Sequence, residues 1–418
     1  MGSKSANANK EAFYILLSII IGLLVGFALY FSGNQEVATY IKPIGDIFLK
    51  LLKMIIVPLV LSSIFMAIIN IGSPDELGSM GMKAIIYYFI TTAIAVFIGI
   101  IMVNLIQPGV GVDISSITQE LTPAQTEKFQ SSANKGLGST IIGVLLDAIP
   151  SNPFRAMADM KILQIIVFSI FLGIISLLNK KVAMPLINFM ESLEKVSMAM
   201  IDMLMKVAPF GIFALMVYVI ANSGFSAIYG LSKYMIAVLL GLFIHFLVLV
   251  LVASWRHKSS PIFIIKSCLP PMLTAFSTAS SASTLPITMN AVQDNLGVNK
   301  KTAQFVLPLG ATINMDGTAL YESVAVIFIG QAYGLDLSIA NQVIIFITAS
   351  LAAVGAAAIP GAGLVTMSIV LSAVGYPLEG IALILAVDRI LDMFRTMINV
   401  FGDCVGTVVI DSFSKKAT

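Results

Sequence analysis

Long runs without a charged side chain constrain the fold of this sequence more than any other feature. A helix that crosses the hydrocarbon core of a membrane needs about 20 mostly apolar residues. Runs of about this length occupy residues 12–35, 54–73, 84–112, 162–179, 207–232 and 234–255. Charged residues make up only 11% of the chain, whereas soluble domains have about 25%. We therefore expect an all-α, multi-pass membrane protein, and this composition excludes an independent soluble fold.

Several functional classes lack their motifs in this chain. The two cysteines, Cys268 and Cys404, have neither a disulfide framework nor a metal-ligand spacing. The Gly-Lys pair of a phosphate-binding P-loop and the GxSxG motif of a hydrolase are both absent from the sequence. The net charge of +2 is too small to indicate nucleic-acid binding. We therefore expect no enzymatic activity, no resident cofactor and no nucleic-acid partner.

The C-terminal third of the sequence interrupts its apolar runs with polar and helix-breaking residues. Residues 277–284 (STASSAST) are mostly hydroxyl side chains. Residues 355–363 (GAAAIPGAG) are rich in helix breakers and lie within a charge-free run over 337–378. Irregular backbone at membrane depth survives only where protein or a water-filled cavity supplies hydrogen bonds. The two segments therefore predict the tips of two re-entrant hairpins.

Each predicted hairpin is followed by an apolar segment that contains a polar cluster. The first cluster spans 310–318, and the second spans 388–403 and includes Gly402 near its end. We expect both segments to be helices whose backbone is interrupted at the cluster. A hairpin followed by an interrupted helix, repeated twice, is typical of transporter repeats with a substrate site at their junction.

Five polar residues of the second cluster fall on one helix face. Their spacing of 4, 3, 4 and 4 residues confines them to an arc of roughly 80°: Asp388, Asp392, Arg395, Asn399 and Asp403. Charges at membrane depth are costly and normally face a bundle interior or a cavity. Arg395 offers a planar fork suited to a carboxylate, and Asp392 can accept an ammonium. The pair favours an acidic amino acid as ligand, and an ion-pair ladder that only joins helices is the alternative.

The first cluster suits cations and a proton. Asn314 and Asp316 place an amide and a carboxylate beside a glycine, and unwound transporter helices supply such oxygens to monovalent cations. A helix kink with a satisfied buried Asp is the alternative. Glu322 lies in the same apolar segment, where burial disfavours its charged form, so it could carry a proton or pair with Arg389. His245, on an apolar face, is expected to be a satisfied core residue.

Four motifs, in this order and spacing, resemble the dicarboxylate/amino acid:cation symporters, which include the excitatory amino acid (glutamate) transporters and their prokaryotic homologues. The motifs are TASSASTLP (278–286), GATINMDGTALYE (310–322), AAIPGAGLVTM (357–367) and VDRILDMFRTMINVFGD (387–403). The resemblance covers most of the chain. It implies an elevator-type secondary transporter with eight transmembrane helices, two re-entrant helical hairpins, inverted repeats and a homotrimeric assembly in membrane lipid.

The resemblance also implies a division of the chain into a scaffold and a transport domain. We expect an N-terminal tail (1–11), scaffold helices 1 and 2 (12–82), transport-domain helix 3 (83–106), an extramembrane loop (107–148), scaffold helices 4 and 5 (149–225) and a transport-domain core (226–418). Within that core we expect helix 6, hairpin 1 at about 261–291, helix 7 at about 302–332, hairpin 2 at about 338–375 and helix 8 at about 378–413.

By resemblance, substrate and sodium ions would share a set of residues. Substrate would contact Ser281, Thr318, Asp392, Arg395, Thr396, Asn399 and the backbone from Ile359 to Gly363. One sodium site would use Asp403 with the carbonyls of Gly310, Asn314 and Asn399. A second would use Thr312 with the carbonyls of Met315, Ala353, Val354 and Ala356. A third would use Tyr88, Thr91, Thr92, Asn314 and Asp316.

Several residues depart from the pattern of the family, among them Ala282 and Ser283 in the serine-rich segment and Ala358, which stands where glycine is common. Ala279 and Met393 stand where many members have an arginine, and an arginine occurs instead at Arg389. The relative affinity for glutamate and aspartate is therefore open. Glu322 resembles the proton-carrying glutamate of the glutamate transporters, so proton co-transport is a hypothesis.

The expected function is thus uptake of glutamate, aspartate or both, coupled to sodium, across a cell (inner or plasma) membrane. Lysines near both chain ends predict cytoplasmic termini. The alternatives within transport are a purely proton-coupled glutamate/aspartate carrier and a neutral amino acid carrier. An ion channel is the alternative from another class, although channels arrange like residues in rings whereas these charges are of mixed sign on one helix.

Overall fold

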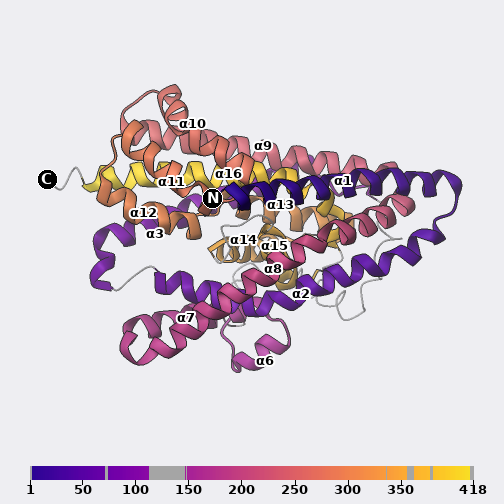
Figure 1. The fold of residues 1–418 in the computed structure, drawn as a ribbon, viewed down its shortest axis with the longest axis horizontal. Coiled ribbons are helices and arrows are strands. Elements are labelled where there is room, and N and C mark those ends of the chain that lie inside the picture. The colour runs from indigo at the N-terminus through magenta and orange to yellow at the C-terminus, as the bar shows by residue number, and fades with distance from the viewer. Residues whose placement is uncertain are drawn as a thin grey trace.

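The computed structural model describes residues 2–70, 74–112, 146, 148–335, 337–354, 362–376 and 380–414, and within these ranges every regular element is a helix (Figure 1). Three of the described helices are individually long and apolar enough to cross a membrane: Met80–Ile106, Ile228–His257 and Val387–Phe413. A fourth span results if Lys180–Ile201 and Lys206–Asn222, which meet at a bend, are counted together. Shorter apolar helices cover Leu17–Ser32, Met54–Ile69, Leu163–Leu178 and Asn341–Ala353. The expected all-α membrane protein is confirmed at this level.

A first helix group consists of α1 (Gly2–Ser32), α2 (Glu36–Asn70), α7 (Ile162–Leu178) and α8 (Lys180–Ser223). Helix α8 packs along both α1 and α2. The close approach of α1 depends on Gly26, because a Cβ atom there would lie 2.7 Å from the Cβ atom of Ile220. The stretch before residue 206 and the apolar stretch after it both belong to α8, which bends between Ile201 and Lys206.

Helix α1 begins at Gly2, so most of the segment assigned to the N-terminal tail (1–11) is helical and continuous with the apolar helix that follows. The segment before residue 12 contains Ala, Lys and Glu, which favour helix, so it extends the apolar helix that follows it. Most of the predicted loop at 107–148 lies outside the described residues. The short helix α6 (Pro153–Ala158) follows it, with the Asn152 side chain accepting a hydrogen bond from the Arg155 backbone at its N-terminus.

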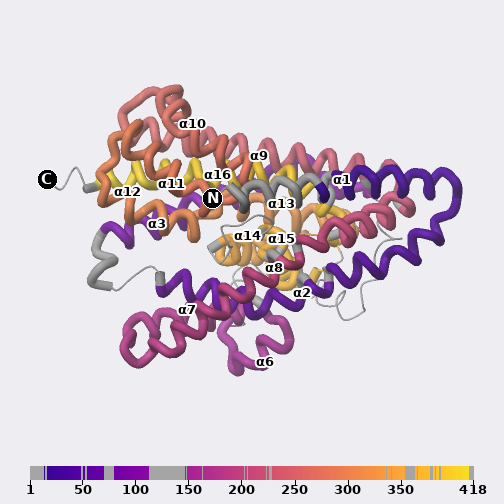
Figure 2. The backbone as a smooth tube through the Cα atoms, in the orientation of Figure 1, coloured from indigo at the N-terminus to yellow at the C-terminus, as the bar shows by residue number. Residues whose placement is uncertain are grey.

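A second helix group contains α3 (Pro74–Ile106), α9 (Phe225–His257) and the elements from α10 onward. Its centre is α16 (Ile381–Ser414), which packs against α9, α10, α12 and α13. Aromatic side chains pack between these helices; for example, the ring centroids of Phe246 on α9 and Phe401 on α16 lie 4.8 Å apart. Figure 2 shows that α3, from the first quarter of the chain, lies beside these C-terminal elements.

Helices α10 (Pro261–Thr278) and α11 (Ser281–Asn290) form a helical hairpin whose tip is Ala279–Ser280. Ala279 has a left-handed backbone, with φ of 49°, which reverses the chain. The Ser280 side chain then accepts a hydrogen bond from the Ser283 backbone and caps α11. The hydroxyl-rich segment therefore lies at the predicted turn. A five-residue π-helix, η1 (Ala291–Asn295), continues α11.

The next segment is interrupted as predicted. Helix α12 (Lys300–Ile313) ends and α13 (Asp316–Ala332) begins with only Asn314 and Met315 between them. Helices α14 (Ile339–Val354) and α15 (Ala362–Val374) then pack against each other. Residues 355–361, the predicted tip of the second hairpin, lie outside the described residues.

The predicted interruption near Gly402 is wrong, because α16 is one continuous helix from Ile381 to Ser414. Gly402 has a packing role instead. A Cβ atom at this position would lie 2.7 Å from Nδ2 of Asn314, so glycine lets the helix approach the break between α12 and α13. The two polar clusters thus differ in backbone: the first lies at a break between helices and the second lies on the face of a continuous helix.

Candidate functional site

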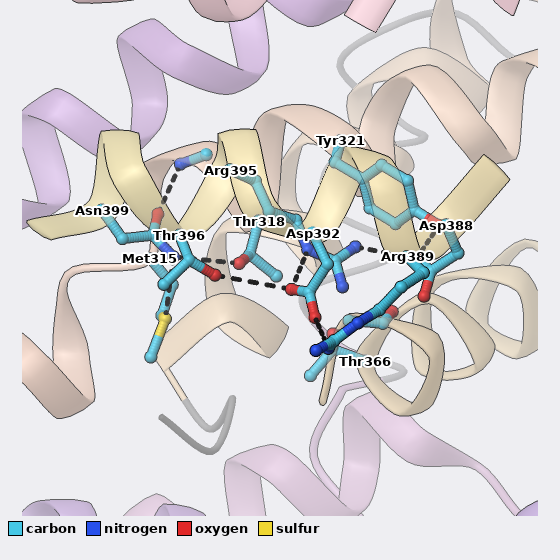
Figure 3. A network of polar contacts seen from close by, with 12 residues as sticks. Met315, Thr318, Tyr321, Thr366, Asp388, Arg389, Asp392, Arg395, Thr396 and Asn399 are labelled. Carbon is cyan, nitrogen blue, oxygen red and sulfur yellow. Dashed lines mark hydrogen bonds and ion pairs between the residues drawn. The ribbon is translucent and has the colours of Figure 1, made fainter. Parts of the chain in front are cut away.

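The polar face of α16 is the centre of the candidate site. All five of its predicted members are buried, and the most enclosed is Arg395, whose exposed fraction is only 1%. Figure 3 shows Asp388, Asp392, Arg395 and Asn399 of this face together with Thr318 and Tyr321 of α13 and Thr366 of α15. Burying a charge without partners costs several kcal/mol, so the site has to supply compensating groups.

Arg395 is held by three neighbours. Its Nε donates to Oδ1 of Asp392 at 2.9 Å, and its Nη1 donates to Oδ1 of Asp388 at 3.1 Å. The guanidinium also lies over the ring of Tyr321, 4.3 Å from its centroid, and the Tyr321 hydroxyl donates to Asp388 at 2.6 Å. The remaining nitrogen, Nη2, is buried and has no hydrogen-bond partner among the described residues. Arg395 is therefore fixed in orientation with one donor left over.

Asp392 lies between two arginines (Figure 3). Besides the bond from Arg395 to Oδ1, its Oδ2 lies 3.5 Å from Nη1 of Arg389. Thr396 also reaches Oδ1, at 3.5 Å. Arg389 therefore pairs with Asp392, and not with Glu322 as one of the two sequence-based hypotheses had it.

Asn399 joins α16 to the start of α13. Its Oδ1 accepts from the Gly317 backbone at 2.8 Å, and its Nδ2 donates to Oγ1 of Thr318 at 3.2 Å. Its Nδ2 also contacts the sulfur of Met315 at 3.2 Å. A Cβ atom on Gly317 would lie 2.5 Å from the Arg395 carbonyl oxygen, so the glycine permits this close approach. The predicted residues Thr318, Thr396 and Asn399 thus meet around Asp392.

Helix α15 reaches the site through its second residue, Gly363. A Cβ atom on Gly363 would overlap the guanidinium of Arg395, including Cζ at 2.5 Å and Nη2 at 2.6 Å. The backbone at the start of α15 therefore lies directly against the unpartnered donor. Ser281 is buried at the first turn of α11, and α11 packs on α16. Ile359, the other predicted backbone contact, lies outside the described residues.

Asp403 belongs to a group of oxygen atoms one turn beyond Asn399. The Asn314 side chain donates to Oδ1 of Asp403 at 2.9 Å and to the Asn399 carbonyl at 3.2 Å. A Cβ atom on Gly310 would lie 2.6 Å from Oδ1 of Asp403, so the backbone of α12 abuts this carboxylate. The amide oxygen of Asn314 is buried without a hydrogen-bond partner among the described residues. The residues of the first predicted sodium site are therefore together, with an acceptor oxygen to spare.

Asp316 forms a second buried group of oxygens with α3. Its Oδ1 accepts from Thr92 at 2.7 Å and from Thr91 at 3.3 Å. Tyr88 lies one turn earlier on α3, and its hydroxyl donates to the Val306 carbonyl at 3.3 Å. The side chains predicted for the third sodium site thus come from α3 and from the break between α12 and α13.

His245 contacts the candidate site, and sequence reasoning did not place it there. It is fully buried on α9, and its Nε2 lies 3.0 Å from Oδ2 of Asp316. The expectation of a satisfied core residue is wrong for its other nitrogen, Nδ1, which has no partner within the described part of the chain. Its position in the middle of a charge-free run was the available signal, because titratable residues at membrane depth usually serve a function.

The second predicted sodium site is described only in part. Thr312 is exposed, and its hydroxyl donates to the Leu309 carbonyl of its own helix at 2.9 Å. Met315 and Ala353 are buried, Val354 ends α14, and Ala356 lies outside the described residues. Across the described ranges, no cluster of three or more His, Cys, Asp or Glu side chains is placed to hold a metal ion. The candidate cation positions therefore combine single carboxylates with amide, hydroxyl and carbonyl oxygens.

Glu322 is fully buried on α13, six residues after Asp316. The side chain of Thr366 on α15 is a hydrogen-bond partner of its carboxyl. An ionised carboxylate in such surroundings is strongly disfavoured, and a protonated one costs much less.

Comparison with known proteins gives a consistent result. The sequence pattern of the sodium:dicarboxylate symporter family matches residues 12–413. The chain is 36% identical to the proton/glutamate-aspartate symporter of Escherichia coli (strain K12), over 97% of this chain and 93% of that protein. It is 35% identical to the proton/sodium-glutamate symport protein of Geobacillus stearothermophilus, over 96% and 94% of the two chains. It is also 35% identical to excitatory amino acid transporter 3 of Bos taurus, over 96% and 84%.

Proposed function

Because the chain belongs to the sodium:dicarboxylate symporter family, we propose that it is a secondary active symporter that takes up glutamate, aspartate or both together with sodium. Its similarity to glutamate and aspartate symporters over nearly its whole length supports cation-coupled transport of acidic amino acids. A transporter of this kind is not an enzyme, and its substrates and ions are cargo.

The unpartnered Nη2 of Arg395 is the observation that carries the choice of substrate. A planar guanidinium with a spare donor, held in orientation by Asp388 and Tyr321, is suited to bind the side-chain carboxylate of the substrate. Asp392, one turn earlier on the same face, can accept the substrate ammonium. A C4-dicarboxylate without an ammonium leaves Asp392 without its ligand, and a neutral amino acid leaves Arg395 without one.

The remaining contacts of the substrate come from four elements. The α-carboxylate would lie among Ser281, Thr318 and Asn399, with Thr396 close to the ammonium and the backbone at Gly363 covering the side chain. The N-termini of α13 and α15 both lie at this site, and the positive ends of helix dipoles favour anionic groups.

Sodium would bind at the two oxygen groups centred on Asp403 and Asp316. The spare amide oxygen of Asn314 and the close backbone of Gly310 support the first position, and the hydroxyls of Thr91 and Thr92 support the second. The site formed by Thr312, Met315, Ala353, Val354 and Ala356 rests on the family resemblance alone. Glu322 would carry a proton, since a fully buried carboxyl costs much less free energy when it is protonated than when it is ionised.

We infer an elevator mechanism in which the second helix group moves against the first. In this assignment α1, α2, α7 and α8 are the scaffold, and α3, α9 and α10 to α16 are the transport domain with its two re-entrant hairpins. The packing of α3 with α9, α13 and α16 supports this division. The protein would act as a homotrimer in a cell membrane with both termini cytoplasmic. The N-terminal end of α1 and the C-terminal end of α16 point the same way (Figure 1).

Radiolabelled uptake into proteoliposomes tests the function. Glutamate, aspartate, serine and succinate are compared while the sodium and pH gradients are imposed separately. We expect saturable uptake of the acidic amino acids that requires inward sodium, and at least a hundredfold loss of substrate affinity in Arg395→Ala, about 3 kcal/mol for a buried charged contact. Arg155→Ala is the matched control, because this arginine forms only an exposed ion pair with Asp159.

Three results would redirect the proposal. Uptake that persists without sodium and needs a pH gradient would identify a proton-coupled carrier. Preference for serine would identify a neutral amino acid carrier, and substrate-independent currents without uptake would identify a channel. Unchanged glutamate uptake by Arg395→Ala would show that the substrate site is elsewhere.

A further inference from the structure

Arg389 has no role in the site proposed above, yet it contacts the carboxylate on which that site depends. Its Nη1 lies 3.5 Å from Oδ2 of Asp392, and its side chain is only 12% exposed. Its Nε is buried and has no hydrogen-bond partner among the described residues. A cation therefore already lies where the substrate ammonium is expected to bind.

The two arginines on Asp392 are held very differently. Arg395 has two short charge-assisted hydrogen bonds and an aromatic ring beneath it. Among the described residues Arg389 forms one longer ion pair, and its long flexible side chain can leave Asp392 by breaking that single ion pair. Since Asp392 Oδ1 already accepts from Arg395, the oxygen that the substrate can claim is the one paired with Arg389. Substrate ammonium and Arg389 thus compete for Oδ2.

The charges around Asp392 balance only if Arg389 is counted. With both carboxyls ionised, Asp388 and Asp392 contribute two negative charges and Arg389 and Arg395 two positive charges, so this cluster is then neutral without substrate. Without Arg389 the cluster has one uncompensated negative charge. Carrying such a charge through the apolar part of a membrane is costly, and a carrier must bring its emptied site back across to begin another cycle.

We propose that Arg389 is a tethered counter-cation that pairs with Asp392 when substrate has left, keeps the emptied site neutral while it returns, and yields Asp392 to the substrate ammonium. This inference rests on the proposed function, because it assigns Asp392 to the ammonium. It makes Arg389 a positioning residue with two opposite effects. It weakens substrate binding by competition, and it speeds the return of the empty carrier.

Two transport assays in proteoliposomes separate these effects. Exchange of internal for external labelled substrate needs only the loaded carrier to cross, whereas net uptake also needs the empty carrier to return. In Arg389→Gln we expect exchange to continue with a half-saturating substrate concentration lowered by about fivefold or more, while net uptake falls by about tenfold or more. Arg389→Lys preserves the charge, so we expect it to keep net uptake within about threefold of the unchanged protein.

Each alternative gives a different pattern. A purely structural role lowers exchange and net uptake in parallel in Arg389→Gln, and that result overturns the proposal. Equal net uptake in Arg389→Gln and the unchanged protein also overturns it, as does a loss in Arg389→Lys as large as that in Arg389→Gln. Failure of the proposed function is recognised separately, because the unchanged protein would then show neither exchange nor uptake of acidic amino acids.

Discussion

Gly363 offers the sharpest test of how the substrate site is built, because a single methyl group is enough to disturb it. In Gly363→Ala the new Cβ atom would meet the Arg395 guanidinium, with Cζ at 2.5 Å and Nη2 at 2.6 Å, whereas ordinary contacts lie at 3.4–4 Å. The guanidinium or the start of α15 therefore has to move by about 1 Å. We expect the movement to displace the spare donor of Arg395 from the position that faces the substrate carboxylate.

The size of the effect follows from the packing. Forcing an extra methyl group into a close-packed site typically costs about 1–3 kcal/mol. If that cost is borne by the substrate complex, the substrate affinity falls by about 5- to 150-fold. A shift of Arg395 by about 1 Å would also lengthen its bonds to Asp388 and Asp392, which now measure 3.1 and 2.9 Å.

The assay is the dependence of initial uptake rate on glutamate and on aspartate concentration at saturating sodium. Gly241→Ala on α9 is the matched control, since its new Cβ atom would meet only the flexible end of Leu320 at 3.1 Å, and we expect a change of less than about twofold there. Thermal unfolding of both variants separates binding from folding. Wild-type affinity in Gly363→Ala would refute the close approach of α15 to Arg395, and equal losses in both variants would show that the effect is not specific to the site.

Two further predictions concern the ions. In His245→Leu the Oδ2 atom of Asp316 loses its partner at 3.0 Å, so we expect the half-saturating sodium concentration to rise by about 5- to 150-fold. In the control variant His245→Gln, which retains a side-chain donor, we expect this concentration to stay nearer the original value. Identical sodium dependence in the two variants and the unchanged protein would contradict the prediction. In Glu322→Gln we expect sodium-dependent uptake to continue while substrate-dependent acidification of the proteoliposome lumen is lost, as followed with a trapped pH indicator dye. Acidification that persists in Glu322→Gln at the original ratio to substrate would exclude Glu322 as the proton carrier.

Periodicity and composition were sufficient to predict the features that depend on neighbouring residues in the sequence. The charge-free runs predicted helices because a lipid-facing segment has to satisfy its backbone internally. The 4, 3, 4 and 4 spacing of the α16 residues predicted one common face, since helix geometry determines it. The break at Asn314–Met315 was likewise visible from the polar residues and glycine that surround it.

Features that depend on distant partners could not be predicted in the same way. Gly402 has the local signature of a helix break, but its packing against Asn314 of another helix gives it a different role. His245 lies 71 residues from Asp316 in sequence, and no residue near His245 in the sequence predicts that contact. Arg389 has two acidic candidates for an ion pair, Glu322 and Asp392, and only the three-dimensional arrangement selects Asp392.

Asn399 belongs to both of the proposed binding regions at once. Its side chain bonds Thr318 and the Gly317 backbone on the substrate side, and its carbonyl accepts from Asn314 beside Asp403 on the cation side. If both ligands bind as proposed, one residue contributes both to substrate binding and to sodium binding. The free energy that couples these two binding equilibria must be reciprocal. Whatever factor sodium contributes to substrate affinity, substrate contributes to sodium affinity, so a substitution at Asn399 that changes this factor would change it equally for both ligands.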